Sequence, residues 1–234
     1  MTQGLPDVPD TLPALAAKHT ATVQPGWPLV RIHDLAGRFP REYHEPRWFG
    51  SHPDTGRFDH HPQGRPRDYA PDHGIIYTAG DDPAAPPSPP AAAGVAAPGN
   101  ALDVALAEFV QADTELVITA GLTLTVAAPT APLQLLDVRT SWGQATRAGT
   151  HLSTAAHHRT QPWARAIRDA YPHLHGILYV PATGGRAVAA ALNETAAGAL
   201  AGGQVLLSRR LTDPAMLAVV EATAERLRFD VTVA

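Results

Sequence analysis

The chain has 234 residues, of which 44% are hydrophobic and 17% charged, so it has enough apolar content for one globular core. It contains no cysteine, which excludes disulfides, cysteine-ligated zinc, iron–sulfur clusters and thiol nucleophiles. Its net charge of -4 gives no electrostatic reason to bind nucleic acid, and no apolar stretch approaches the roughly 20 residues of a membrane helix. We therefore expect a soluble, cytoplasmic protein that binds neither nucleic acid directly nor a membrane.

The first third of the chain is dominated by proline, glycine, histidine and arginine. Residues 1–28 show little periodicity and are interpreted as an arm that either packs on the domain or stays mobile. The runs WPLVRIH (27–33) and GIIYTA (74–79) predict strands, and the sequence between them is mostly loop. The Pro/Ala-rich stretch 81–99 predicts an inserted surface loop, extended or mobile.

Helix and strand signals follow one another through the rest of the chain. The helices that we expect are 100–111 with Asn100 as N-cap, 161–171 with Pro162 near its start, 213–227 capped by Asp213, and one opening in 184–196. The strands that we expect are 115–126, 133–138, 176–180, 204–211 and 229–233. This order predicts a protein of mixed α and β structure with a loop-rich N-terminal third.

Three charged residues are candidates for a site. Glu108 lies off the core stripe of the helix 100–111 and beside small apolar residues, so it is either a solvated carboxylate or one that faces a semi-enclosed cleft. Arg57 follows a glycine in a loop, where its guanidinium is either a surface group or a ligand for diphosphate. Arg31 interrupts an apolar strand and needs a carboxylate or an anion if it is buried.

Other motifs argue against several common sites. Adjacent histidines such as His60 and His61 point to opposite sides of an extended chain and HExxH is absent, so we expect no metal site. The run ATGGRA (182–187) is either a phosphate-binding turn or a plain strand-to-helix turn. Neither GxxxxGK nor GxSxG occurs, which removes support for a Walker loop or a hydrolase nucleophile elbow.

Taken in order, several segments resemble the RES domain, a family named for Arg, Glu and Ser. They are VRIH with Arg31, FGSHPDTGRFD with Arg57, GIIYTA with Tyr77, ALAEFV with Glu108, LLDVRTSWG, and QPWARAIRDAYPHLHGILYVPATGG. No single piece is specific, whereas the ordered series is. The resemblance implies an α+β fold over residues 29–234, with an ADP-ribosyltransferase-like mixed sheet core flanked by helices.

The resemblance also implies an activity. RES proteins consume NAD⁺ by hydrolysis or phosphorolysis of the nicotinamide–ribose bond, so NAD⁺ is expected as substrate and no prosthetic group is expected. Members are commonly toxins of toxin–antitoxin pairs, neutralised by an antitoxin with a helix-turn-helix domain of the Xre type. The resemblance leaves a homodimer open.

The matching positions imply roles for particular residues. Glu108, Arg57 and Tyr77 are expected to be catalytic, and Arg31 and Phe58 to contact NAD⁺. A carboxylate stabilises an oxocarbenium-like transition state, while arginines hold a diphosphate bidentately. Tyr77 is expected to stack on a ring or orient the ribose.

The sequence departs from the family pattern at its serine. The family's Tyr-x-Ser reads Tyr179, Val180, Pro181 here, so the hydroxyl is missing unless Thr183 or Ser153 supplies it. Two alternatives therefore stay open beside NAD⁺ cleavage. One is an ADP-ribosyltransferase that modifies a protein, and the other is a catalytically silent RES-like binding module, for which the proline is the best argument.

Overall fold

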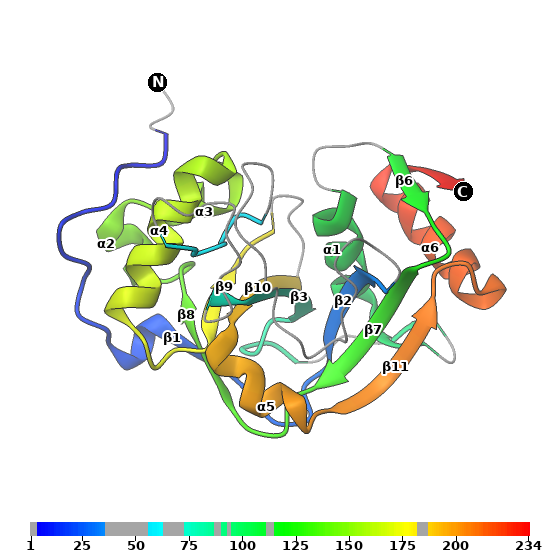
Figure 1. Cartoon of the computed structure of the whole chain (residues 1–234), viewed down its shortest axis with the longest axis horizontal. Coiled ribbons are helices and arrows are strands. Elements are labelled where there is room, and N and C mark those ends of the chain that lie inside the picture. Colours follow the sequence, from blue (N-terminus) through cyan, green and yellow to red (C-terminus); the bar gives the residue numbers. More distant parts are fainter. Residues whose placement is uncertain are drawn as a thin grey trace.

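The computed structural model describes residues 4–35, 56–62, 73–86, 90–92, 95–110, 115–181 and 187–234. Within these residues, eight strands form one curled mixed sheet in the order β1-β8-β9-β10-β3-β2-β7-β11, flanked by helices (Figure 1). Only β8 and β9 are parallel in this sheet, and its other neighbouring strands are antiparallel. The expected α+β class, a mixed sheet core flanked by helices, is confirmed.

The elements have the following bounds. The strands of the large sheet are β1 (Thr20–Val23), β2 (Leu29–Asp34), β3 (Ile75–Asp81), β7 (Leu122–Ala128), β8 (Leu133–Asp137), β9 (Gly176–Tyr179), β10 (Ala187–Asn193) and β11 (Gln204–Arg210). Two smaller sheets pair β4 (Pro90–Ala92) with β5 (Val95–Pro98), and β6 (Glu115–Ile118) with β12 (Asp230–Val233). The helices are α1 (Gly99–Val110), α2 (Ser141–Thr146), α3 (His151–Thr154), α4 (His157–Ala170), α5 (Ala197–Ala201) and α6 (Pro214–Leu227), with short 3-10 turns η1 (Ala17–His19) and η3 (Glu194–Ala196).

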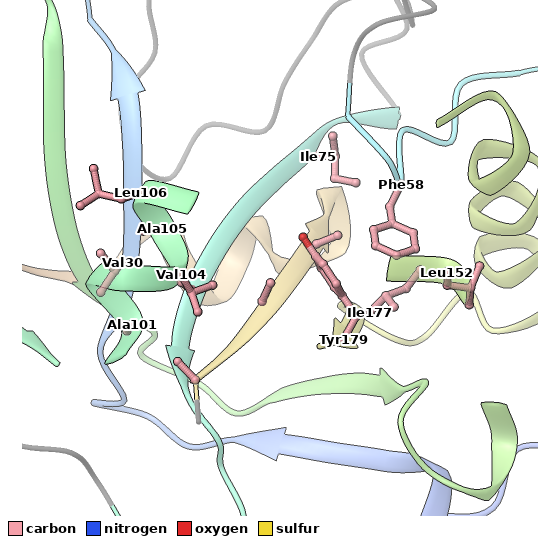
Figure 2. Close-up of a cluster of buried hydrophobic side chains, with 14 of the residues drawn as sticks. Val30, Phe58, Ile75, Ala101, Val104, Ala105, Leu106, Leu152, Ile177 and Tyr179 are labelled. Atoms are coloured by element: carbon pink, nitrogen blue, oxygen red, sulfur yellow. The ribbon is translucent and has the colours of Figure 1, made fainter. Parts of the chain in front are cut away.

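The large sheet buries a different apolar cluster on each face. Because side chains alternate along a strand, Ile75 and Ala79 of β3 join the larger cluster with α1 and α4, whereas Ile76 joins a smaller one with α5. Figure 2 shows part of the larger cluster, which includes both Val104 of α1 and Phe58. The face of the sheet that carries the larger cluster is therefore the face covered by α1 and by the segment around Arg57.

The expected helices 100–111, 161–171 and 213–227 are confirmed as α1, α4 and α6, with starts shifted by one to four residues. Asp213 caps α6 as expected, because its Oδ1 accepts the backbone N–H of Ala215 at 3.0 Å. In α1, Ala101 and Ala105 are buried and their small side chains let the helix lie close to the sheet. None of the helices in the described part is long and apolar enough to cross a membrane.

The prediction of a helix opening in 184–196 is wrong. Residues 187–193 form β10, which pairs with β9 on one side and β3 on the other. All seven residues are buried, so the strand is covered on both faces and its backbone bonds are made in two ladders. Tertiary burial thus overrides the high helix propensity of its four alanines.

Two expectations about strands also need correction. The stretch 115–126 is not one strand, because a turn at 119–121 separates β6 from β7 and sends them into different sheets. Within the Pro/Ala-rich insertion 81–99, expected as an extended or mobile loop, β4 and β5 pair as an antiparallel ribbon. A two-stranded ribbon tolerates prolines at its ends, such as the Pro90–Pro98 pair, because their missing N–H groups can face outward.

Of the two interpretations of the N-terminal arm, its described part shows packing. Three side chains of the α4 region bind its backbone carbonyls: Trp163 Nε1 donates to Pro6 O at 3.0 Å, Arg159 Nη2 to Leu5 O at 2.7 Å, and Tyr171 Oη to Pro13 O at 2.5 Å. Leu5 is itself 6% exposed. The arm therefore extends the core over α4.

Substituting Gly176 tests the junction at which β9 enters the sheet. The residue has φ +151°, and a Cβ there would lie 2.2 Å from the carbonyl oxygen of Ala191 on β10. We expect Gly176→Ala to lower the free energy of unfolding by about 2 to 4 kcal/mol in urea titrations. The control is Gly198→Ala in α5, where nothing lies within 4 Å of the new methyl group and stability should not fall. Equal stability of the two variants would contradict this account.

Candidate active site

The segment 56–62, which carries Arg57 and Phe58, lies on the larger apolar face of the sheet and is held there by Tyr77 of β3. The Tyr77 hydroxyl accepts the backbone N–H of Phe58 at 2.8 Å and donates to Oδ1 of Asp59 at 3.0 Å. Gly56 lies against the same ring, where an added Cβ would be 2.2 Å from the hydroxyl oxygen. The expected catalytic tyrosine thus uses its hydroxyl to hold the two residues that follow Arg57, while its ring lies against Gly56 before it.

The start of α4 holds the same segment from its other side. Thr160 Oγ1 donates to the carbonyl oxygen of Arg57 at 2.6 Å, and Gln161 Nε2 donates to that of Gly56 at 3.4 Å. The Arg57 guanidinium in turn donates through Nη1 to the carbonyl oxygen of Ala155, two residues before α4 begins. Arg57 is therefore fixed through both its backbone and its side chain.

Glu108 reaches this region from the end of α1. Its Oε2 accepts a hydrogen bond from the Tyr179 hydroxyl of β9 at 2.9 Å. The Tyr179 ring lies against Phe58, with 4.8 Å between ring centroids and 59° between ring planes. Glu108, Phe58 and Tyr179 therefore bring α1, the segment 56–62 and β9 together at one place.

The Tyr179 hydroxyl is influenced by one negative charge, that of Glu108, and by one positive charge, that of Arg57. Burial raises the pKa of the Tyr179 hydroxyl well above its usual value, and the charge and hydrogen bond of Glu108 raise it further. The positive charge of Arg57 opposes this shift. The site therefore combines a carboxylate, a guanidinium and a phenol that keeps its proton.

Tyr179 is the residue of this site that sequence reasoning did not assign a role. It stood out only as the tyrosine of the family's Tyr-x-Ser pattern, two residues before Pro181. A buried tyrosine usually finds a partner for its hydroxyl, which was the available signal. Its partner is 71 residues away in sequence, so no local pattern could identify it.

The structure does not bring the other expected binding residues that it describes to the place where Glu108, Phe58 and Tyr179 meet. Arg31 is 8% exposed and lies between Val30 and Ile32, which face the larger cluster with α1, so strand alternation puts Arg31 on the opposite face of the sheet. Ser153 is 4% exposed in α3 and lies two residues before the carbonyl that binds Arg57. Thr183 lies outside the described residues.

A cluster of three charged side chains, His60, Glu194 and Arg168, holds the C-terminal part of the segment 56–62 against the core. His60 Nε2 lies 3.0 Å from Oε2 of Glu194, whose Oε1 accepts from Arg168 Nη2 at 2.5 Å. Burial would raise the pKa of Glu194, but the hydrogen bonds and charges of its two partners outweigh burial and lower that pKa. The cavity beside this group, about 20 Å³, has room for a water molecule and not for a nucleotide.

The described residues contain no cluster of three histidines or carboxylates that could hold a metal ion. His60, a candidate ligand by residue type, is engaged with Glu194 instead. The absence of a metal requirement stays a prediction.

No protein-family model matches the sequence, and no curated protein matches it either. Among solved structures, the chain is similar to one in the crystal structure of the M. tuberculosis MbcT–MbcA toxin–antitoxin complex. The two chains are 15% identical, the match covers 88% of this chain and 91% of the other, and the TM-score is 0.46. At this identity and TM-score, the likeness carries no argument of its own for the activity.

Removing the Tyr77 hydroxyl tests its hold on the segment that carries Arg57. Tyr77→Phe keeps the ring and removes one donor and one acceptor, so we expect the free energy of unfolding to fall by about 2 kcal/mol. Hydrogen exchange should accelerate at the Phe58 amide, which loses its acceptor. If stability and exchange at Phe58 were both unchanged, Tyr77 would not hold the segment.

Glu194→Gln tests the cluster of His60, Glu194 and Arg168. The lowered pKa of Glu194 means that its charge stabilises the fold above its unfolded pKa and that this stabilisation is lost as pH falls through the folded pKa. We expect the variant to be about 2 kcal/mol less stable than wild type at pH 7. The gap should narrow below pH 4.5, the ordinary pKa of this carboxyl, in urea titrations across the acid range. A gap that did not change with pH would show that the charge of Glu194 is not its source.

Proposed function

We propose that the protein cleaves the nicotinamide–ribose bond of NAD⁺. The observation that carries the proposal is the convergence of Glu108 and Arg57 around Tyr179 and Phe58, at the positions that the RES resemblance implies. A carboxylate and a guanidinium held close together suit a substrate whose reacting ribose becomes cationic while its diphosphate stays anionic.

In this mechanism the bond between ribose C1′ and the nicotinamide nitrogen breaks, and its electron pair leaves with nicotinamide, which becomes neutral. Glu108 stabilises the positive charge that develops at C1′ and O4′. Water or phosphate then adds to C1′ and releases a proton. Nicotinamide needs no protonation to leave, so the site can act with one carboxylate and no strong acid.

The remaining residues of the site act on substrate position. Arg57 holds the diphosphate. Phe58 is buried against Tyr179 and supports the site from beneath, so its contact with NAD⁺ stays a prediction. Tyr77 contributes by holding Phe58 and Asp59, the two residues that follow Arg57. A contact of NAD⁺ with Arg31, Ser153 or Thr183 stays a prediction.

The RES resemblance further supports a toxin role with a helix-turn-helix antitoxin as partner. A chain that lowers cellular NAD⁺ arrests growth, and a bound antitoxin prevents this. Two alternatives share the site: transfer of ADP-ribose to a protein, and a silent module that binds without turnover. Pro181 supports the silent module, because it is buried two residues after Tyr179 and offers no hydroxyl.

Substitutions at the two charged residues test the proposal. We expect purified wild-type protein to deplete NAD⁺, and Glu108→Gln and Arg57→Ala to slow turnover by about 100-fold or more, because each loses a charge that the transition state or the diphosphate requires. The control is Asp103→Asn, which removes another carboxylate of α1 that pairs with Arg226 of α6 at 2.7 Å, and should keep wild-type turnover. Induced expression should arrest bacterial growth for wild type and Asp103→Asn only.

The products separate the alternatives. Free ADP-ribose indicates hydrolysis, a phosphorylated ADP-ribose formed only with phosphate present indicates phosphorolysis, and label attached to protein indicates transfer. Full turnover by Glu108→Gln would overturn the site assignment. If wild type consumed no NAD⁺ with water, phosphate or protein as acceptor, the enzyme would be excluded and the silent module would remain.

A further inference from the structure

Glu108 lies at a position that helix electrostatics disfavour. It lies in the last described turn of α1 (Gly99–Val110), toward the negative end of the helix dipole, and that turn contains no basic residue. A carboxylate at that place weakens the helix slightly, so helix stability gives no reason for it. Any group that stabilises or orients the Glu108 carboxylate must therefore come from outside the last turn of α1.

Tyr179 of β9 is bonded to this carboxylate. Its side chain is 1% exposed, and among the described residues its hydroxyl makes a single hydrogen bond, the one to Glu108 Oε2 at 2.9 Å. The ring has no room to turn away, because Phe58 packs on it and β9 holds its backbone opposite Ala189 of β10. Figure 2 shows the Tyr179 ring beside that of Phe58 within the larger cluster.

The hydroxyl also keeps the proton that it donates. Burial and the nearby Glu108 charge raise the pKa of Tyr179, and Arg57 is the charged group that opposes them. The net pKa stays well above the usual value, so the phenol is a donor throughout the neutral range. The Tyr179 hydroxyl therefore keeps its role as donor to the Glu108 carboxylate.

We propose that Tyr179 is a positioning residue that fixes the Glu108 carboxylate in one orientation, ready to face the ribose of the substrate. The inference rests on the NAD⁺-cleaving function proposed above. Tyr179 acts through Glu108 and does not touch the substrate. One carboxylate oxygen is bonded to Tyr179, which leaves the other to face the developing positive charge.

The experiment compares Tyr179→Phe with Tyr171→Phe. The first variant keeps the ring against Phe58 and loses only the hydroxyl. The second also loses a buried tyrosine hydroxyl, one bonded to Pro13 O at 2.5 Å and Trp142 Nε1 at 3.0 Å, away from Glu108. Both variants lose stability, so thermal unfolding is measured for each and kinetics are recorded well below either transition.

For Tyr179→Phe we expect kcat for NAD⁺ cleavage to fall by about 10- to 100-fold with little change in KM, because a hydrogen bond to a charged group is lost and no substrate contact is. A loss of stability alone would not produce this separation of kcat from KM. Tyr171→Phe should keep the wild-type kcat and KM.

Each outcome decides a different statement. A wild-type kcat in Tyr179→Phe would overturn the role of Tyr179 and leave the proposed function standing. Equal losses of kcat in Tyr179→Phe and Tyr171→Phe would overturn that role as well, because they would reflect stability alone. No NAD⁺ cleavage by wild type would overturn the proposed function and this inference together.

Discussion

The hydroxyl of Tyr77 is the contact on which the candidate site depends. The segment 56–62 forms neither helix nor strand, so its backbone groups need partners from side chains. Tyr77 provides one acceptor and one donor, while Thr160 and Gln161 of α4 bind the neighbouring carbonyls. The tyrosine approaches so closely that position 56 has room only for glycine. Without these bonds, nothing in regular secondary structure would hold Arg57 near Glu108.

The sheet sets the distances between groups that are far apart in sequence. Tyr77 and Tyr179 lie on strands separated by β10, whose alanines leave space on the face that carries α1. Because the side chains at the centre of that face are small, α1 comes close enough to the sheet for Glu108 to reach Tyr179. The same packing that forms the core therefore delivers the carboxylate to the aromatic pair, and stability and site geometry share one set of contacts.

Local patterns predicted the elements whose pattern matched their environment. Helix α1 was predictable from its apolar spacing, and so was the position of Glu108 off the core stripe. Strand β10 was not, because alanine favours helices locally and only its neighbours on both sides make it a strand. The bond from Tyr179 to Glu108 and the opposite-facing side chain of Arg31 depend on which strands pair, and a single sequence does not contain that information in any local form.

The two partly buried glutamates near the segment 56–62 have different bonding partners. Glu194 is paired with His60 and Arg168, so its charge is largely neutralised and its lowered pKa reflects that pairing. A carboxylate neutralised in this way has little field left with which to stabilise a new cation. Glu108 accepts from a neutral phenol instead, which orients it without pairing it with a cation. That difference in partners is the physical reason to propose the chemistry at Glu108 and not at Glu194.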